Sequence, residues 1–270
     1  MSRISRQESR QVALRNALQD DICEVADVAS HSEKGCILIS RQVFDIGDLI
    51  FEEVPQLIVS PSTFPANTIK ALEAVCREAN LHSVLSNSSN DDNCLVSVRT
   101  LLPALQFLRE DFETQSKAFL MYCPPEAAVP PAFLRVLRHS LALILRRGLV
   151  DPAAAAAAGR RHALEAAAAL ERIALVCQCN IFAVADDASE SALCLAAGTA
   201  SHACLPACNW HFSPAGRFQL RAARRLGPGD ELTVSYLQAE RSPRPASCSE
   251  RAREDVCVCA RARACVWQRP

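Results

Sequence analysis

The sequence predicts an α+β fold in which short strands are interrupted by a block of helices. Near the N-terminus, three short apolar runs are separated by turn residues: Ile37–Ile39, Leu49–Phe51 and Leu57–Val59. Runs of this kind are typical of strands, and their succession predicts a β-meander. Between residues 97 and 178 the apolar residues recur at helical spacing instead, and strand-like runs return after Asn180.

Turn residues and prolines set the limits of the first elements. Residues 1–21 form a polar lead-in that we expect to be helical. The turn Asp45–Asp48 separates the first two apolar runs, and Pro55 and Pro61 bound the third. A short helix is predicted near Ile69–Ala79, and the polar tract Ser86–Asn93 that follows it predicts an exposed loop.

The helical block contains two predicted helices. The first is indicated by apolar residues at positions 133, 134, 137, 141, 144 and 145, and Gly148 is a natural stop. Asp151 and Pro152 begin a second helix, which is rich in alanine and continues from Ala153 to Val176. Further along, a turn at residues 227–229 precedes the last of three predicted strands. These strands are Ile181–Val184, Arg217–Ala222 and Glu231–Tyr236.

Composition and charge exclude several classes of protein. The 270 residues carry 29 Lys and Arg against 30 Asp and Glu, a formal net charge of -1, whereas nucleic-acid binding needs clustered positive charge. We therefore expect no direct nucleic-acid binding. No apolar stretch reaches about 18 residues and no signal peptide is evident, so no membrane span is expected. The 14 cysteines are then expected as thiols or metal ligands in a reducing compartment, cytoplasmic and/or nuclear.

Three segments carry the residue types of a reactive or metal-binding site. Gly229–Tyr236 has the pattern of a strand that ends in a phenol, and the chain has only 2 tyrosines. Ser201–Ala207 places His202 and Cys204 on a loop. Both have a structural alternative, because a Tyr at a strand end or a His on an apolar loop often only packs. Cys257–Cys265 gathers three thiols, one fewer than a tetrahedral structural zinc needs.

The order of these motifs resembles the signature of SET-domain protein-lysine methyltransferases. Their central motif, Asn-His-Ser-Cys-x-Pro-Asn, is matched at its His, Cys and Pro, which are residues 202, 204 and 206. Their Gly-Glu-Glu-Leu-Thr-x-x-Tyr is matched by Gly229–Tyr236, and their opening Lys-Gly-x-Gly-Leu is similar to Lys34–Leu38. Cys179–Phe182 resembles the Asn-x-Phe of the SET-and-MYND (SMYD-like) group.

The resemblance implies a β-rich SET fold of short strands, split by a helical insertion and followed by a cysteine-rich post-SET tail. The N-terminal half of the domain would span residues 22–60, the loop and helical insertion 61–175, the C-terminal half 176–240 and the zinc-binding tail 241–270. A separate MYND zinc module is not evident in residues 60–95, where the Cys and His residues are Cys76, His82 and Cys94.

The resemblance also implies an activity, which is methyl transfer from S-adenosylmethionine to a lysine side-chain amine in a protein substrate, histone or non-histone. Tyr236 would orient that amine. The implied cofactor contacts are Gly35, Cys36, Ile37, Asn180, Ser201 and His202. The implied ligands of a structural zinc are Cys204, Cys257, Cys259 and Cys265, with Cys177, Cys179, Cys208 and Cys248 as substitutes.

Several positions depart from the family pattern. Ile37 stands where the family has a second glycine, so its side chain is expected to crowd the cofactor. Ser201 and Ala207 replace the two asparagines of the central motif, and the gap between Cys259 and Cys265 is longer than usual. These departures leave a second hypothesis open, a catalytically degenerate SET-like protein that serves as a protein-binding module.

Overall fold

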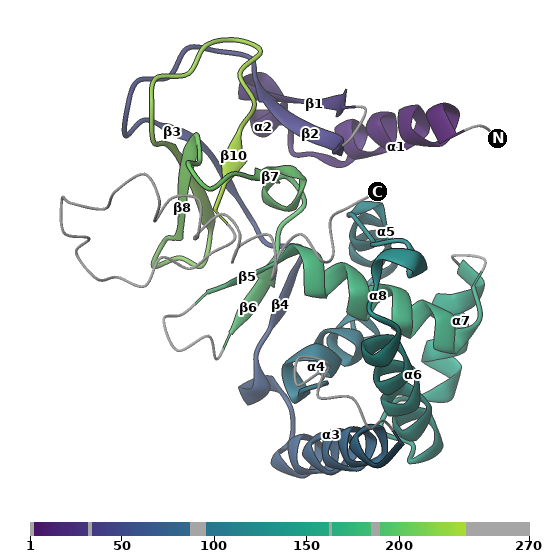
Figure 1. Cartoon of the computed structure of the whole chain (residues 1–270). Helices are drawn as coiled ribbons and strands as arrows, with labels where there is room; N and C mark the ends of the chain where they lie inside the picture. Colours follow the sequence, from purple (N-terminus) through teal and green to yellow (C-terminus); the bar gives the residue numbers. More distant parts are fainter. Residues whose placement is uncertain (1–2, 32–33, 87–95, 162–163, 185–189, 236–270) are drawn as a thin grey trace. The chain divides into compact units, whose positions relative to one another are not determined.

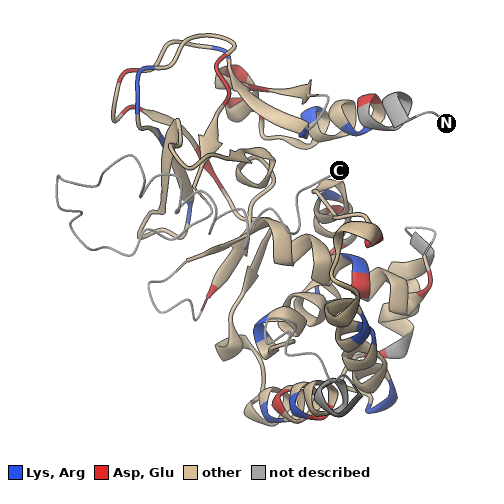
Figure 2. Ribbon diagram, viewed as in Figure 1, with Lys and Arg blue, Asp and Glu red and all other residues tan. Residues whose placement is uncertain are grey.

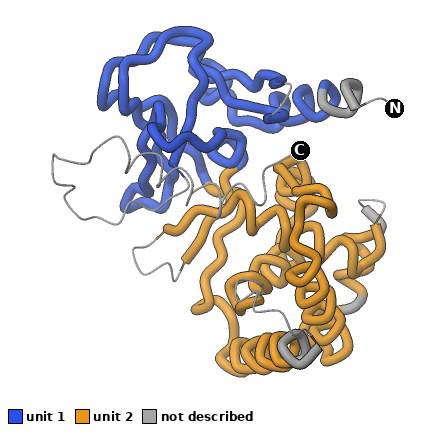
Figure 3. Tube along the Cα trace, viewed as in Figure 1, with its two compact units in different colours: residues 1–54, 195–270 blue, residues 55–194 orange. Residues whose placement is uncertain are grey.

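The computed structural model describes residues 3–31, 34–86, 96–161, 164–184 and 190–235 (Figure 1). By its internal contacts the chain divides into two compact units, one of residues 1–54 and 195–270 and the other of residues 55–194 (Figure 3). We call them unit 1 and unit 2. Unit 1 therefore takes its residues from both ends of the chain, whereas unit 2 is one continuous segment.

Unit 1 holds most of the strands. Its elements are α1 (Arg3–Ala17), α2 (Asp20–Val25), β1 (Ala26–His31), β2 (Gly35–Ser40), β3 (Leu49–Glu53), the 3₁₀ turn η3 (Ala197–Thr199), β7 (Ser201–His202), β8 (Cys208–Phe212), β9 (Phe218–Ala222) and β10 (Thr233–Val234). They form three small sheets: antiparallel β1-β2, antiparallel β3-β9-β8 and parallel β10-β7. The core of the unit contains Phe218, Leu38 and Leu232, all 0% exposed.

The prediction of a β-meander is wrong, although its three strands exist. Strand β2 pairs with β1, β3 pairs with β9, and β4 (Leu57–Val59) pairs with β6 (Ser191–Leu193). The segment between β2 and β3 bonds instead to a distant part of the chain, since Phe44 and Leu226 exchange both backbone hydrogen bonds at 3.0 and 2.9 Å. Pairing across such distances leaves no local signal in the sequence.

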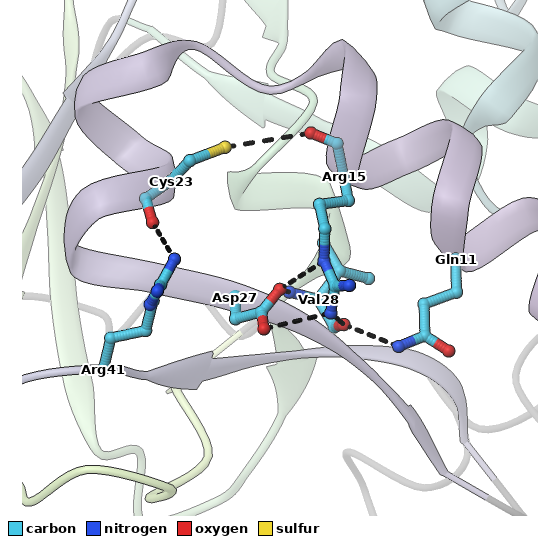
Figure 4. A network of polar contacts seen from close by, with 6 residues as sticks. All are labelled: Gln11, Arg15, Cys23, Asp27, Val28 and Arg41. Carbon is cyan, nitrogen blue, oxygen red and sulfur yellow. Dashed lines mark hydrogen bonds and ion pairs between the residues drawn. The ribbon is translucent and has the colours of Figure 1, made fainter.

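The predicted helix at the N-terminus is confirmed as α1, and it packs on β1 (Figure 4). The side chain of Leu14, a residue of α1, is fully buried. Arg15 makes two hydrogen bonds to the Asp27 carboxylate, at 2.7 and 3.0 Å, and also donates to the Val28 carbonyl, as does Gln11. These side chains therefore cover part of the backbone of β1.

Unit 2 is mainly helical. Its elements are β4, η1 (Pro61–Thr63), α3 (Ala66–Ser86), α4 (Val98–Phe107), α5 (Phe112–Leu120), η2 (Glu126–Ala128), α6 (Pro131–Arg146), α7 (Pro152–Arg161), α8 (Ala166–Asn180), β5 (Ile181–Ala183) and β6. Helix α8 packs against α4, α5, α6 and α7, and Ile173 and Val176 at 0% exposure lie in that core. The strands form an antiparallel sheet in the order β4-β6-β5.

The helix predicted to end at Gly148 is confirmed as α6, and Gly148 adopts a left-handed φ of 64°. The single alanine-rich helix from Ala153 to Val176 is wrong, because the chain forms α7 and α8 there. Gly159 explains the break: a Cβ on it would lie 2.5 Å from the Leu164 carbonyl oxygen, so the chain turns back in close contact with this glycine. The helix predicted near Ile69–Ala79 is longer than expected, and most of the polar tract after it lies outside the described residues.

Charged residues of both signs are spread over the elements of both units, which fits the net charge of -1 (Figure 2). In unit 2, for example, Arg138 forms ion pairs with Glu126 and Glu171. None of the described helices combines the length and the apolar character that crossing a membrane requires.

Candidate functional site

In unit 1, backbone hydrogen bonds join the two segments that carry most of the predicted cofactor contacts to a third segment, residues 229–234. Leu232 N donates to the Leu38 carbonyl of β2 at 2.8 Å. Two residues later, β10 pairs in parallel with β7, with Val234 opposite His202, and Ala203 N donates to the Val234 carbonyl at 3.0 Å. The fold thus brings β2 and β7 together on residues 229–234. We call these three segments together the strand junction.

Glu231 connects the three parts of the strand junction through its side chain. Its carboxylate accepts hydrogen bonds from Lys34 Nζ at 2.7 and 2.9 Å and from Ser201 Oγ. Burial raises the pKa of this carboxyl, but the hydrogen bonds from Lys34 and Ser201 outweigh burial, and the pKa is lowered overall. Glu231 is therefore ionised at neutral pH and ties the start of β2 to β7.

Gly35 opens β2 with a φ of 83°, which glycine adopts without strain. A Cβ placed on it would meet no heavy atom within 4 Å, so open space lies beside this backbone. Cys36 is half-buried, and burial raises the pKa of its thiol. Ile37 is only 7% exposed, so its side chain packs against protein atoms.

The central motif places His202 and Cys204 close together. His202 is half-buried, and burial lowers the pKa of its imidazole, partly offset by a backbone hydrogen bond with Val234. The ring is therefore neutral at neutral pH. Cys204 is exposed, and its Sγ lies 3.8 Å from His202 Nε2.

Two contacts fix the end of β10. Thr233 Oγ1 accepts a hydrogen bond from Ala207 N at 2.8 Å, in the interior of the unit. The Trp210 indole N–H donates to the Ser235 carbonyl at 3.3 Å, and its ring stacks on Phe218 with centroids 5.9 Å apart. The backbone is thus held as far as Ser235, the last described residue.

Asn180 lies in unit 2, at the end of α8. It is 5% exposed, and its Nδ2 donates to the carbonyls of Tyr122 and Val176 at 2.8 and 2.6 Å. These bonds join the end of α8 to the segment after α5, so the amide nitrogen has a structural use within this unit.

The other predicted site residues, Tyr236, Cys257, Cys259 and Cys265, lie outside the described residues, as does the substitute ligand Cys248. Within the described part of the chain, no group of three His, Cys, Asp or Glu side chains is arranged to hold a metal ion. Two substitute ligands, Cys177 and Cys208, are each 1% exposed, and burial raises the pKa of both thiols.

Sequence reasoning missed three polar residues of unit 1, which are Lys34, Glu53 and Glu231. Lys34 and Glu231 lie inside the motifs that resemble the family. The replacement of asparagine by Ser201 in the central motif was a signal, because a different side chain at that position needs a different hydrogen-bond partner, which is Glu231. Glu53 carried no comparable signal, because its partners are backbone N–H groups 143 and 144 residues away.

One solved structure that the fold resembles is described as the SET domain of LSMT bound to lysine and AdoHcy. The similarity has a TM-score of 0.44 at 12% sequence identity and covers 86% of this chain and 54% of the other, so this chain spans about half of that chain's length. No curated protein matches the sequence.

A family model described as the SET domain matches residues 35–237, which is more than half of the 270 residues. The matched range begins at Gly35, the first residue of β2, and includes β7 and residues 229–234. The predicted α+β SET fold, with helices between two strand-rich parts, is thereby confirmed. The chain belongs to the SET domain family.

Proposed function

We propose that this chain transfers the methyl group of S-adenosylmethionine to the side-chain amine of a lysine in a protein substrate, histone or non-histone. The observation that carries the proposal is the strand junction, which lies within the SET domain match. It joins the Gly35 end of β2 to the Ser201–His202 pair of β7 through Lys34 and Glu231.

The residues at the strand junction fit such a cofactor. The backbone at Gly35, with open space beside it, allows a ligand to approach closely. Ser201 donates its hydroxyl hydrogen to Glu231 and keeps lone pairs that accept hydrogen bonds from a ligand. The proposed contacts in this unit are Gly35, Cys36, Ile37, Ser201 and His202. Asn180, in unit 2, is a proposed contact that rests on the resemblance to the family alone.

When bound, S-adenosylmethionine supplies an activated methyl group to a neutral amine. The protein has to align the amine with that group and exclude water. Tyr236 is the proposed catalytic residue, since its hydroxyl would orient the amine by a hydrogen bond. The Trp210 bond to the Ser235 carbonyl supports this role, because it fixes the backbone next to Tyr236.

We also propose a structural zinc ion held by Cys204, Cys257, Cys259 and Cys265. Cys204 suits this role because its thiol is exposed, next to a neutral imidazole. The ion would fasten the C-terminal tail to the loop after β7. A helical unit inside the domain and the proposed tail support the proposal that the chain belongs near the SMYD-like group, with no MYND zinc module evident in its sequence.

A second candidate function is a protein-binding module without catalysis. It is favoured by Ile37, which is buried where the family has a glycine, and by the loss of both asparagines of the central motif.

Radiolabelled methyl transfer to a mixed pool of proteins separates the two candidates. We expect the parent chain to label lysine in at least one protein of the pool. A parent chain that binds S-adenosylmethionine but labels nothing in a broad pool would favour the module.

A further inference from the structure

Glu53, the last residue of β3, is a buried carboxylate whose partners are backbone groups. It is 2% exposed, and its Oε1 and Oε2 accept hydrogen bonds from Ala196 N and Ala197 N, both at 3.0 Å. None of the ion pairs among the described residues includes Glu53. Burying a carboxylate without a cation costs free energy, and the hydrogen bonds to the two backbone N–H groups have to offset that cost.

The backbone that Glu53 holds leads directly into the central motif. Ala196 is the N-cap of η3, and Ala197 is its first residue. Hydrogen bonds close this turn, from Thr199 N to the Ala196 carbonyl at 2.9 Å and from Thr199 Oγ1 to the Leu195 carbonyl at 2.8 Å. Strand β7 starts two residues after η3, and η3 packs against β2. The position of η3 therefore sets where β7 lies relative to β2.

We propose that Glu53 is a positioning residue whose carboxylate anchors η3 and thereby sets the spacing of β2 and β7. Its effect on cofactor affinity rests on the proposed function, whereas its anchoring of η3 does not. The two oxygens act together, because each accepts from one of two successive N–H groups. A group that accepts through only one oxygen would leave one of these buried N–H groups unpaired.

The anchor is expected to depend on pH near neutrality. Burial raises the pKa of Glu53 from 4.5 to about 7, and the backbone hydrogen bonds from Ala197, Ala196 and Leu195 oppose this rise only in part. Above this pKa both oxygens accept. Below it one oxygen carries a proton but keeps acceptor capacity, and the cost of burying the charge disappears. Because the pKa is higher in the anchored state than in a solvent-exposed carboxyl, protonation favours the anchored state, and the hold on η3 should weaken as the pH rises through about 7.

Other titratable groups near β3 have separate partners. Helix α2 and strand β9 pack against β3, and η3 packs against β2. Arg221 on β9 donates to the Gly47 carbonyl, Cys23 on α2 to the Arg15 carbonyl, and Glu52 on β3 accepts from Gln219. The remaining titratable groups of these elements are Asp20, Asp21 and Glu24 on α2 and Cys36 on β2, and none forms an ion pair with Glu53. Lys34, just before β2, pairs with Glu231. We therefore assign the pH response to Glu53 itself.

The test compares Glu53→Gln with Glu52→Gln, a matched control on the same strand that undergoes the same chemical change. Hydrogen–deuterium exchange of residues 195–203, corrected for the intrinsic rate, would be measured at about pH 6 and about pH 8. In the parent, protection of Ala196 and Ala197 should be about tenfold greater at the lower pH, because the proton on Glu53 favours the anchored state. Glu53→Gln should lose this protection at both values, and Glu52→Gln should match the parent.

Affinity for S-adenosylmethionine, measured by calorimetry over the same range, should follow the same pattern. It should fall as the pH rises in the parent and in Glu52→Gln, and stay low and flat in Glu53→Gln. If exchange follows Glu53 but the parent binds no S-adenosylmethionine, the anchor stands and the proposed function falls. A parent whose protection does not change with pH, or a folded Glu53→Gln with the protection of the parent, would overturn the anchor. Should Glu53→Gln fail to fold, the pH profile of the parent decides.

Discussion

The two units differ in how far apart in the sequence their interacting residues lie. In unit 1, Lys34 and Glu231 are 197 residues apart, and Glu53 binds backbone groups 143 and 144 residues away. In unit 2, the ion pair of Arg138 and Glu171 spans 33 residues. The candidate cofactor residues other than Asn180 all lie in unit 1. Polar contacts there join the segments of the candidate site, whereas similar contacts in unit 2 join neighbouring helices.

Among the described thiols, Cys204 alone is exposed. In unit 2, burial raises the pKa of Cys76 to about 11 and that of Cys179 to about 12, so these groups stay protonated. In unit 1, Cys204 is exposed beside His202. A metal-binding role therefore fits Cys204 better than the thiols of unit 2.

The largest effect is expected from removal of the proposed zinc ion. Binding of a structural zinc contributes about 10 kcal/mol or more in small zinc domains, so its loss should release the tail. Cys204→Ser should lower the zinc content and the thermal stability, measured by metal analysis and calorimetric melting. Cys123→Ser, a half-buried thiol of unit 2, is the control and should keep the metal. Purified parent protein without zinc, and with reactive thiols at all four positions, would contradict the proposal.

Next in size is the loss of one hydroxyl at the proposed catalytic residue. Tyr236→Phe keeps the ring but removes the hydrogen bond to the lysine amine, so turnover should fall about 30- to 1000-fold. Cofactor affinity should stay within about twofold, because the contact acts mainly in the transition state. The measurement is radiolabelled methyl transfer by both proteins. Equal incorporation would remove Tyr236 from the mechanism.

The pH dependence of stability offers a third test. The pKa of Glu53 is raised from 4.5 to about 7 by burial, so its contribution to folding is fully present below 4.5 and is lost as the pH rises through about 7. The difference corresponds to on the order of 3 kcal/mol. Denaturant unfolding at several pH values should show this decline in the parent and in Glu52→Gln but not in Glu53→Gln. Parallel profiles of all three proteins would refute the raised pKa.

The smallest effect is expected from replacing one glutamate of an ion pair in each unit, which compares the two units directly. Glu231→Gln removes the carboxylate that pairs with Lys34 and accepts a hydrogen bond from Ser201. We expect S-adenosylmethionine affinity to fall about tenfold. Glu171→Gln removes the partner of Arg138 in unit 2, and we expect no change in affinity and less than about 1 kcal/mol in stability, because the pair is partly exposed. Similar losses of affinity in both variants would show that the contrast between the units is wrong.

Local patterns predicted individual elements well but not their partners. Helix α6 and strands β2, β3, β5 and β9 follow from apolar spacing and turn residues. Their pairing could not be predicted, because it depends on contacts between distant segments. Strands β1 and β8 were missed, since Ala26–His31 and Cys208–Phe212 mix polar and apolar residues without a clear period.

The candidate site shows the same limit. The motif order predicted that Gly35 and Ser201 would serve one site, and the structure joins their strands through residues 229–234. It did not predict the groups that hold them, Glu53 and the pair of Lys34 and Glu231. The partners of Glu53 are backbone N–H groups, which any residue except proline provides, so no side-chain pattern marks them.

Calorimetric titration of the parent chain with S-adenosylmethionine asks whether the strand junction of unit 1 forms a cofactor site. We expect saturable binding of a single molecule per chain, weakened by Glu231→Gln and unchanged by Glu171→Gln. Absence of binding by folded parent protein, or equal binding by parent and Glu231→Gln, would contradict it.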